Sequence, residues 1–170
     1  MPAYIALLRA VNVGGTGKLP MAELKAMCAA EGFTKIETYI ASGNVVFAAK
    51  QSASKVKALL EKRLHAYAGK PIRVIVRTPD EMAAVLKSNP FPRSAPNRTL
   101  TIFLDDPPPA DALDHIRGRK DEEVRLGKQE IYVAYGAGMG VSKLKIPAAR
   151  NGTARNINTI AKLIELAGVL

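Results

Sequence analysis

The order in which strand and helix patterns follow one another constrains the fold of this sequence more than any other feature. Short apolar runs predict strands, and apolar residues spaced by three or four positions predict helices. The first half carries, in order, a strand over 4–8, a helix over 20–31, a hairpin of strands over 36–41 and 45–48, a helix over 52–68 and a strand over 71–77. This order, βαββαβ, is the ferredoxin-like split arrangement.

The same order begins again in the second half of the chain. A linking helix opened by Thr78 or Asp80 and a proline-rich loop over 89–97 separate the two halves. The elements then predicted are a strand over 100–104, a helix over 110–116, a hairpin over 123–126 and 130–135, a helix over 154–167 and a short strand over 168–170.

These patterns together predict an α+β protein made of two consecutive ferredoxin-like (βαββα) units with mostly antiparallel sheets. We expect a first unit over 1–78, a linker over 79–97 and a second unit over 98–170. The halves share no repeat at the level of single residues. The duplication is therefore inferred from element order alone.

The composition of the chain indicates its cellular compartment and the charge of the partners that it would bind. The single Cys28 cannot form an internal disulfide, and its apolar neighbours predict a core position on a helix. No export segment and no membrane-spanning run is visible, so we expect a cytoplasmic protein. Twenty-five basic residues against 15 acidic ones give a net charge of +10, which favours anionic partners.

Two polar bends of the first unit are predicted to lie at one edge of its sheet. In a βαββαβ sheet the first and third strands are antiparallel neighbours, so the loop after strand one lies beside the turn between strands two and three. The residues brought together are Arg9, Asn12, Gly14, Gly15 and Lys18 from the loop and Ser42, Gly43 and Asn44 from the turn. This edge either binds an anionic or carbonyl-bearing ligand, or its glycines and polar groups only shape the turns.

A second polar cluster precedes the last predicted helix. Asn151 or Thr153 is a plausible N-cap, but capping does not account for so many Asn and Thr residues in a helix. The cluster consists of Thr153, Arg155, Asn156, Asn158 and Thr159. It is a candidate for a ligand or interface role.

Familiar catalytic patterns fail on spacing. Residues 14–18 mimic a phosphate loop, but its first glycine would fall on Asn12 and its Ser/Thr on Leu19. His65 and His115 lack the further His or Cys that a zinc site needs. We therefore predict no metal and no cofactor, and the sequence identifies no catalytic residue.

Three blocks of residues resemble the bacterial proteins grouped as domain of unknown function 1697. The blocks are Leu7 to Gly15, Tyr39 to Phe47 and Thr153 to Thr159. The resemblance implies a compact α+β fold with ferredoxin-like parts and supplies no activity. Two positions depart from the family pattern: Ala10 stands where the family often carries Gly, and Ile157 stands where Trp is usual.

Three functions stay open at this point. The first is a binding module for a phosphorylated small molecule or a nucleic acid; stacking of RNA bases on the hairpin could use only Tyr39 and Phe47. The second is an enzyme of unknown class, with Arg9, Lys18 and Arg155 stabilising an anionic substrate. The third is a homodimeric structural or interaction protein, and the sequence does not determine the oligomeric state.

Overall fold

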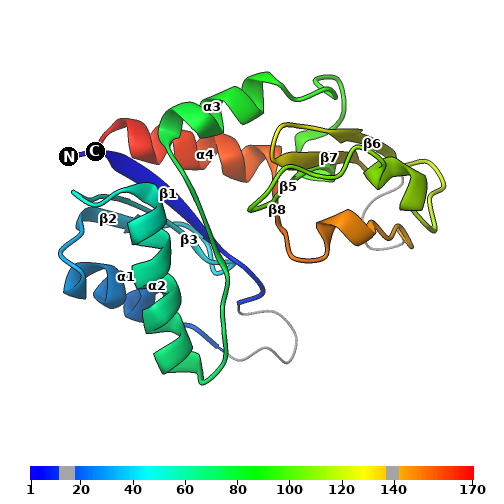
Figure 1. Ribbon diagram of the computed structural model, residues 1–170. Helices are drawn as coiled ribbons and strands as arrows, with labels where there is room; N and C mark the ends of the chain where they lie inside the picture. Colours follow the sequence, from blue (N-terminus) through cyan, green and yellow to red (C-terminus); the bar gives the residue numbers. More distant parts are fainter. Residues whose placement is uncertain (12–17, 137–141) are drawn as a thin grey trace. The chain divides into compact units, whose positions relative to one another are not determined.

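The computed structural model describes residues 1–11, 18–136 and 142–170 of the chain (Figure 1). The chain forms two compact units. Unit 1 comprises Met1–Ala83 and Lys162–Leu170, and unit 2 comprises Ala84–Ala161. The divisions fall inside α3 (Pro79–Lys87) and α4 (Ile157–Gly168), so each of these helices contributes residues to both units.

Unit 1 is built on a four-stranded sheet of order β2-β3-β1-β4, in which all neighbouring strands are antiparallel. This is the strand order of the predicted βαββαβ arrangement. Its elements are β1 (Ala3–Leu8), α1 (Met21–Ala30), β2 (Thr34–Thr38), β3 (Asn44–Ala48), α2 (Ala53–Ala68) and β4 (Val74–Arg77).

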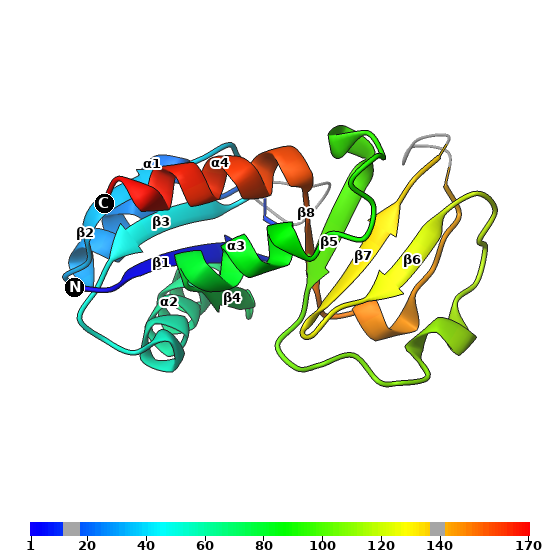
Figure 2. The ribbon, with the colours of Figure 1, turned by 90° about the horizontal axis from the view of Figure 1, so that it is seen from above.

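Both faces of this sheet are covered. On one face, Tyr4 and Leu8 of β1 and Phe47 of β3 belong to a core cluster with residues of α1 and α2. On the other face lie the parts of α3 and α4 that belong to unit 1, which carry the buried Met82 and Leu163 (Figure 2). Burial on both faces explains why β1 is a continuous apolar run rather than an alternating one.

Unit 2 repeats this strand order. Its sheet runs β6-β7-β5-β8 with antiparallel neighbours, which is again second, third, first and fourth when its strands are counted from β5. Its strands are β5 (Thr99–Phe103), β6 (Glu123–Leu126), β7 (Glu130–Ala134) and β8 (Thr153–Asn156). The α+β class with two similar units, predicted from element order, is therefore confirmed.

The helix predicted over 110–116 is wrong. The structure has a single 3-10 turn there, η2 (Ala112–His115), in which Ala112 is buried and Leu113 is 40% exposed. Short helices are stable mainly when an apolar face packs against the protein, and this segment buries too little. A second 3-10 turn, η1 (Pro96–Arg98), lies in the predicted proline-rich loop.

The last helix begins later than predicted. Residues 153–156 are the strand β8, because their backbone pairs with β5 from Phe103 opposite Thr153 to Leu100 opposite Asn156. Pairing with a distant strand is invisible to local helical periodicity. At the other end α4 runs to Gly168, so the short strand predicted over 168–170 is also wrong.

The linking helix is confirmed as α3, and its start is a reciprocal capping box. Thr78 Oγ1 accepts a hydrogen bond from the N–H of Glu81 at 3.1 Å, and Glu81 Oε1 accepts one from the N–H of Thr78 at 2.9 Å. Two N–H groups that a helix start leaves unpaired are satisfied in this way.

Two buried threonines of β5 allow a matched test of the core of unit 2. Thr99 and Thr101 are both fully buried, but Thr99 Oγ1 donates to the carbonyl of Ala95 at 3.0 Å, whereas Thr101 Oγ1 has no hydrogen-bond partner among the described residues. An unpaired buried hydroxyl costs stability, and a paired one contributes to it.

We expect Thr101→Val to raise the free energy of unfolding by about 1 kcal/mol and Thr99→Val to lower it by about 1 kcal/mol. Urea unfolding followed by circular dichroism measures both changes. Changes of the same sign in the two variants would contradict the assigned hydrogen bonding.

Candidate functional site

The two polar bends predicted to meet in unit 1 do meet. Leu7 of β1 lies opposite Asn44 of β3, and the N–H of Leu8 donates to the carbonyl of Gly43 at 2.8 Å. We call this edge the β1 rim and define it by Arg9, Ser42, Gly43 and Asn44. Lys18, also predicted for this edge, lies just before α1. The rim residues Asn12, Gly14 and Gly15 named from the sequence lie outside the described residues.

The turn of the rim is longer than predicted. β2 ends at Thr38 rather than at residue 41, and a loop over 39–43 leads to β3. The fully buried Asn44 closes this loop. Its Nδ2 donates to the carbonyl of Tyr39 and to Ser42 Oγ, each at 2.9 Å, while its own carbonyl accepts from the N–H of Tyr39 at 3.0 Å. Asn44 therefore has a structural role whatever else the rim does.

Gly43 is the residue whose lack of a side chain lets the two bends approach. It is buried and has a φ of +89°, a conformation that other residues adopt only at a cost. A Cβ built on it would lie 2.6 Å from Val11 Cγ2 and 2.9 Å from Leu8 Cβ. Any larger residue would push the turn away from the end of β1.

Two further residues of the rim region have left-handed backbones without being glycine. Ala10 has a φ of +55° and Ile40 a φ of +50°. Such conformations are uncommon for non-glycine residues, and a β-branched residue such as Ile40 is an outlier. A glycine at position 10 would adopt this backbone without the steric cost that alanine bears. Ile40 is also 50% exposed, so it gains little from burial in return.

Arg73 is joined to the β1 rim by a backbone hydrogen bond with Arg9. The N–H of Arg9 donates to the carbonyl of Arg73 at 3.0 Å, which continues the pairing of β1 with the segment that enters β4.

Lys18 is exposed and precedes α1, whose N-cap Pro20 makes no side-chain hydrogen bond to the first turn. Pro20 therefore does not supply the side-chain acceptor that an N-cap residue usually offers to the N–H groups of the first turn.

The second polar cluster, Thr153 to Thr159, lies in unit 2, where most of its members have structural partners. Asn156, not Asn151 or Thr153, caps α4, because its Oδ1 accepts from the N–H of Thr159 at 2.9 Å. Thr159 is buried in the first turn and Asn158 is exposed there. A cap and a strand explain why Asn and Thr are frequent in this segment.

Arg155 is a buried cation of β8. Arg155 Nη1 donates to Thr153 Oγ1 at 2.7 Å and to the carbonyl of Ala154 at 2.9 Å. Only 7% of Arg155 is exposed, and this burial lowers the pKa of the guanidinium to about 10. The side chain is charged at neutral pH and fixed by its own strand.

One ion pair on α2, which sequence reasoning missed, protects the edge of the sheet. Glu61 Oε2 accepts from the N–H of Val74 at 3.0 Å and from Lys57 Nζ at 2.8 Å. Lys57 Nζ also donates to the carbonyl of Val74 at 2.6 Å. The N–H and carbonyl of Val74, on the edge strand β4, are thereby paired to a helix, which protects this point of the edge against association with another strand. The i, i+4 spacing of the pair was visible in the sequence, but its partner on β4 was not.

The groups that could carry covalent or metal chemistry are few. Cys28 is fully buried in α1, as its apolar neighbours predicted, and burial raises the pKa of its thiol to about 12. It is therefore a poor nucleophile at neutral pH. Over the described ranges, no three His, Cys, Asp or Glu side chains are grouped so that they could hold a metal ion.

None of the helices in the described part of the chain is long and apolar enough to cross a membrane.

Comparisons with known proteins agree with this architecture. The family model for proteins of unknown function DUF1697 matches residues 1–132. A solved structure of the conserved bacterial protein SP0830 from Streptococcus pneumoniae is similar over 98% of both chains, with a TM-score of 0.80 and 26% sequence identity. The search of curated proteins gave no match.

The close approach at Gly43 gives a testable prediction. We expect Gly43→Ala to lower the free energy of unfolding by about 2–4 kcal/mol, because the left-handed backbone and the contact with Val11 each add a cost. Gly32→Ala is the matched control, since Gly32 also has a positive φ, +82°, but a Cβ there would meet no atom within 4 Å. Urea unfolding should show a clearly smaller loss for the control, and equal losses would contradict the tight contact.

Proposed function

We infer that this chain, which belongs to the DUF1697 family of proteins of unknown function, binds an anionic ligand at the β1 rim. The observation that carries the proposal is the meeting of three segments, over 8–11, 39–44 and 69–73. Leu8 bonds to Gly43 and Arg9 bonds to Arg73 through the backbone. In sequence these segments contain Arg9, Lys70 and Arg73 but neither Asp nor Glu.

A concentration of positive charge attracts anions and raises their local concentration. The start of α1 adds to this effect, because the N-terminus of a helix carries a partial positive charge and N–H groups that favour an anion. Among the described residues, Lys18 leads into this helix, and Arg9 and Ser42 are only partly buried. Cationic and hydroxyl groups are therefore within reach of solvent at the rim.

The ligand class is a phosphorylated small molecule or a nucleic acid. Stacking of bases on strand aromatics has little support, because Phe47 is fully buried and stacks on Phe33 with ring centroids 4.5 Å apart. Of the two aromatics considered on the hairpin, this leaves Tyr39, which is half-buried. A mode that relies on charge and backbone N–H groups fits the rim better.

The proposal is tested by titrating ¹⁵N-labelled protein with inorganic phosphate. We expect amide shifts at residues 8–10 and 42–44, and about a tenfold weaker affinity in Arg9→Gln, since loss of one charged hydrogen bond is worth about 1.4 kcal/mol or more. Lys50→Gln is the matched control, because it removes an exposed charge just after β3, at the opposite end of that strand from the rim. Unperturbed rim amides, or an equal loss in both variants, would overturn the proposal.

A further inference from the structure

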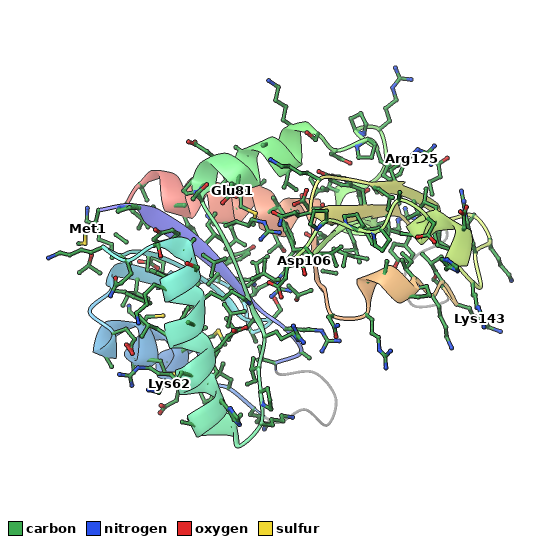
Figure 3. The ribbon with its side chains drawn as sticks, in the orientation of Figure 1. Met1, Lys62, Glu81, Asp106, Arg125 and Lys143 are labelled. Atoms are coloured by element: carbon green, nitrogen blue, oxygen red, sulfur yellow. The ribbon has the colours of Figure 1, made fainter. Side chains whose placement is uncertain are left out.

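A cavity of about 460 Å³ opens beside Arg73, on the part of unit 1 where α2 ends and the chain returns to the sheet. It is lined by Glu61, Lys62, His65, Pro71, Ile72 and Arg73. Lys62 is labelled in Figure 3. The chain reaches this wall by turning at Gly69, whose φ of +72° ends α2. A volume of this size is typical of sites for small organic ligands.

The wall of the cavity is held in place by the contacts that protect β4. Glu61 is bonded to the N–H of Val74 and to Lys57, so the one carboxylate of the lining is occupied and its charge is matched. Lys57 is bonded in turn to the carbonyl of Val74. The helix and the segment over 71–74 therefore form a fixed frame rather than two independent surfaces.

The remaining polar lining is basic. Lys62 and Arg73 are exposed cations, and His65 is exposed in the last turn of α2. Pro71 and Ile72 add an apolar wall between these groups. Cations at the mouth of a pocket with an apolar wall suit a ligand that has both an anionic group and an organic body.

We propose that this cavity binds a phosphorylated small molecule, with its phosphate between Lys62 and Arg73 and its organic part against Pro71 and Ile72. The inference rests on the proposed function and extends it, because Arg73 lines the cavity and also bonds to Arg9 of the β1 rim through the backbone. The β1 rim attracts an anionic ligand, and the cavity favours phosphorylated small molecules among such ligands. A nucleic acid fits less well, since none of the lining residues is a Phe, Tyr or Trp on which a base could stack.

The test compares three probes on the labelled full-length protein: phenyl phosphate, inorganic phosphate and an oligothymidylate. We expect phenyl phosphate to shift the amides of residues 61–65 and 71–74 and to bind more tightly than inorganic phosphate. Lys62→Gln and Arg73→Gln should each weaken phenyl phosphate about tenfold. Lys55→Gln, on the same helix and two turns away, should change the affinity less than twofold, and melting curves confirm that each variant is folded.

The outcomes separate the cavity from the rim. Shifts confined to 8–10 and 42–44, with affinity lost in Arg9→Gln but kept in Lys62→Gln, would overturn the cavity and leave the rim proposal standing. An equal loss in Lys55→Gln, or tight binding of oligothymidylate that falls steeply with salt, would also overturn the cavity proposal. The absence of shifts with all three probes would overturn both proposals.

Discussion

The antiparallel pairing of β1 with β3 is the interaction on which the rest of unit 1 depends. Its register, from Ala3 opposite Ala48 to Leu7 opposite Asn44, decides which residues of β1 face α1 and α2. A slip by one position would turn every side chain to the other face of the sheet. The same register carries the end of β1 to the turn before β3, where Gly43 accepts the bond from Leu8. Core packing and the geometry of the rim thus have one origin.

The two units repeat one chain path with different sequences. In each, the last or next-to-last residue of the fourth strand is a buried arginine, Arg77 or Arg155, whose Nη1 donates to the carbonyl of the residue before it. The next residue, Thr78 or Asn156, caps the helix that follows. This correspondence is a repeat in geometry that residue identities do not reveal, because different side chains meet the same capping requirement.

Features of the fold were predictable from the sequence where they depend on interactions between residues that are close together in the chain. The apolar run of β1 and the capping residue Thr78 are signals contained within a few neighbouring residues. Each correctly predicted its element, the strand β1 and the helix α3. β8 has a short polar sequence, and only its pairing with β5 makes it a strand, so local periodicity misassigned it to the helix. Meeting of the two bends was predictable because strand topology fixes it. The cavity beside Arg73 was not, because no local pattern connects Lys62 with Ile72.

The two units differ in the segment that connects their third and fourth strands. Between β3 and β4, unit 1 has the sixteen-residue helix α2, which supplies the contacts to Val74 and the wall of the cavity. At the corresponding place in unit 2, the helical element among the described residues before β8 is the short turn η4 (Pro147–Ala149). The frame formed by α2 and the segment over 71–74 therefore depends on α2 and does not follow from the strand order that the two units share. Fold similarity alone says little about activity, and the residues that line the cavity belong to this helix and the segment that follows it.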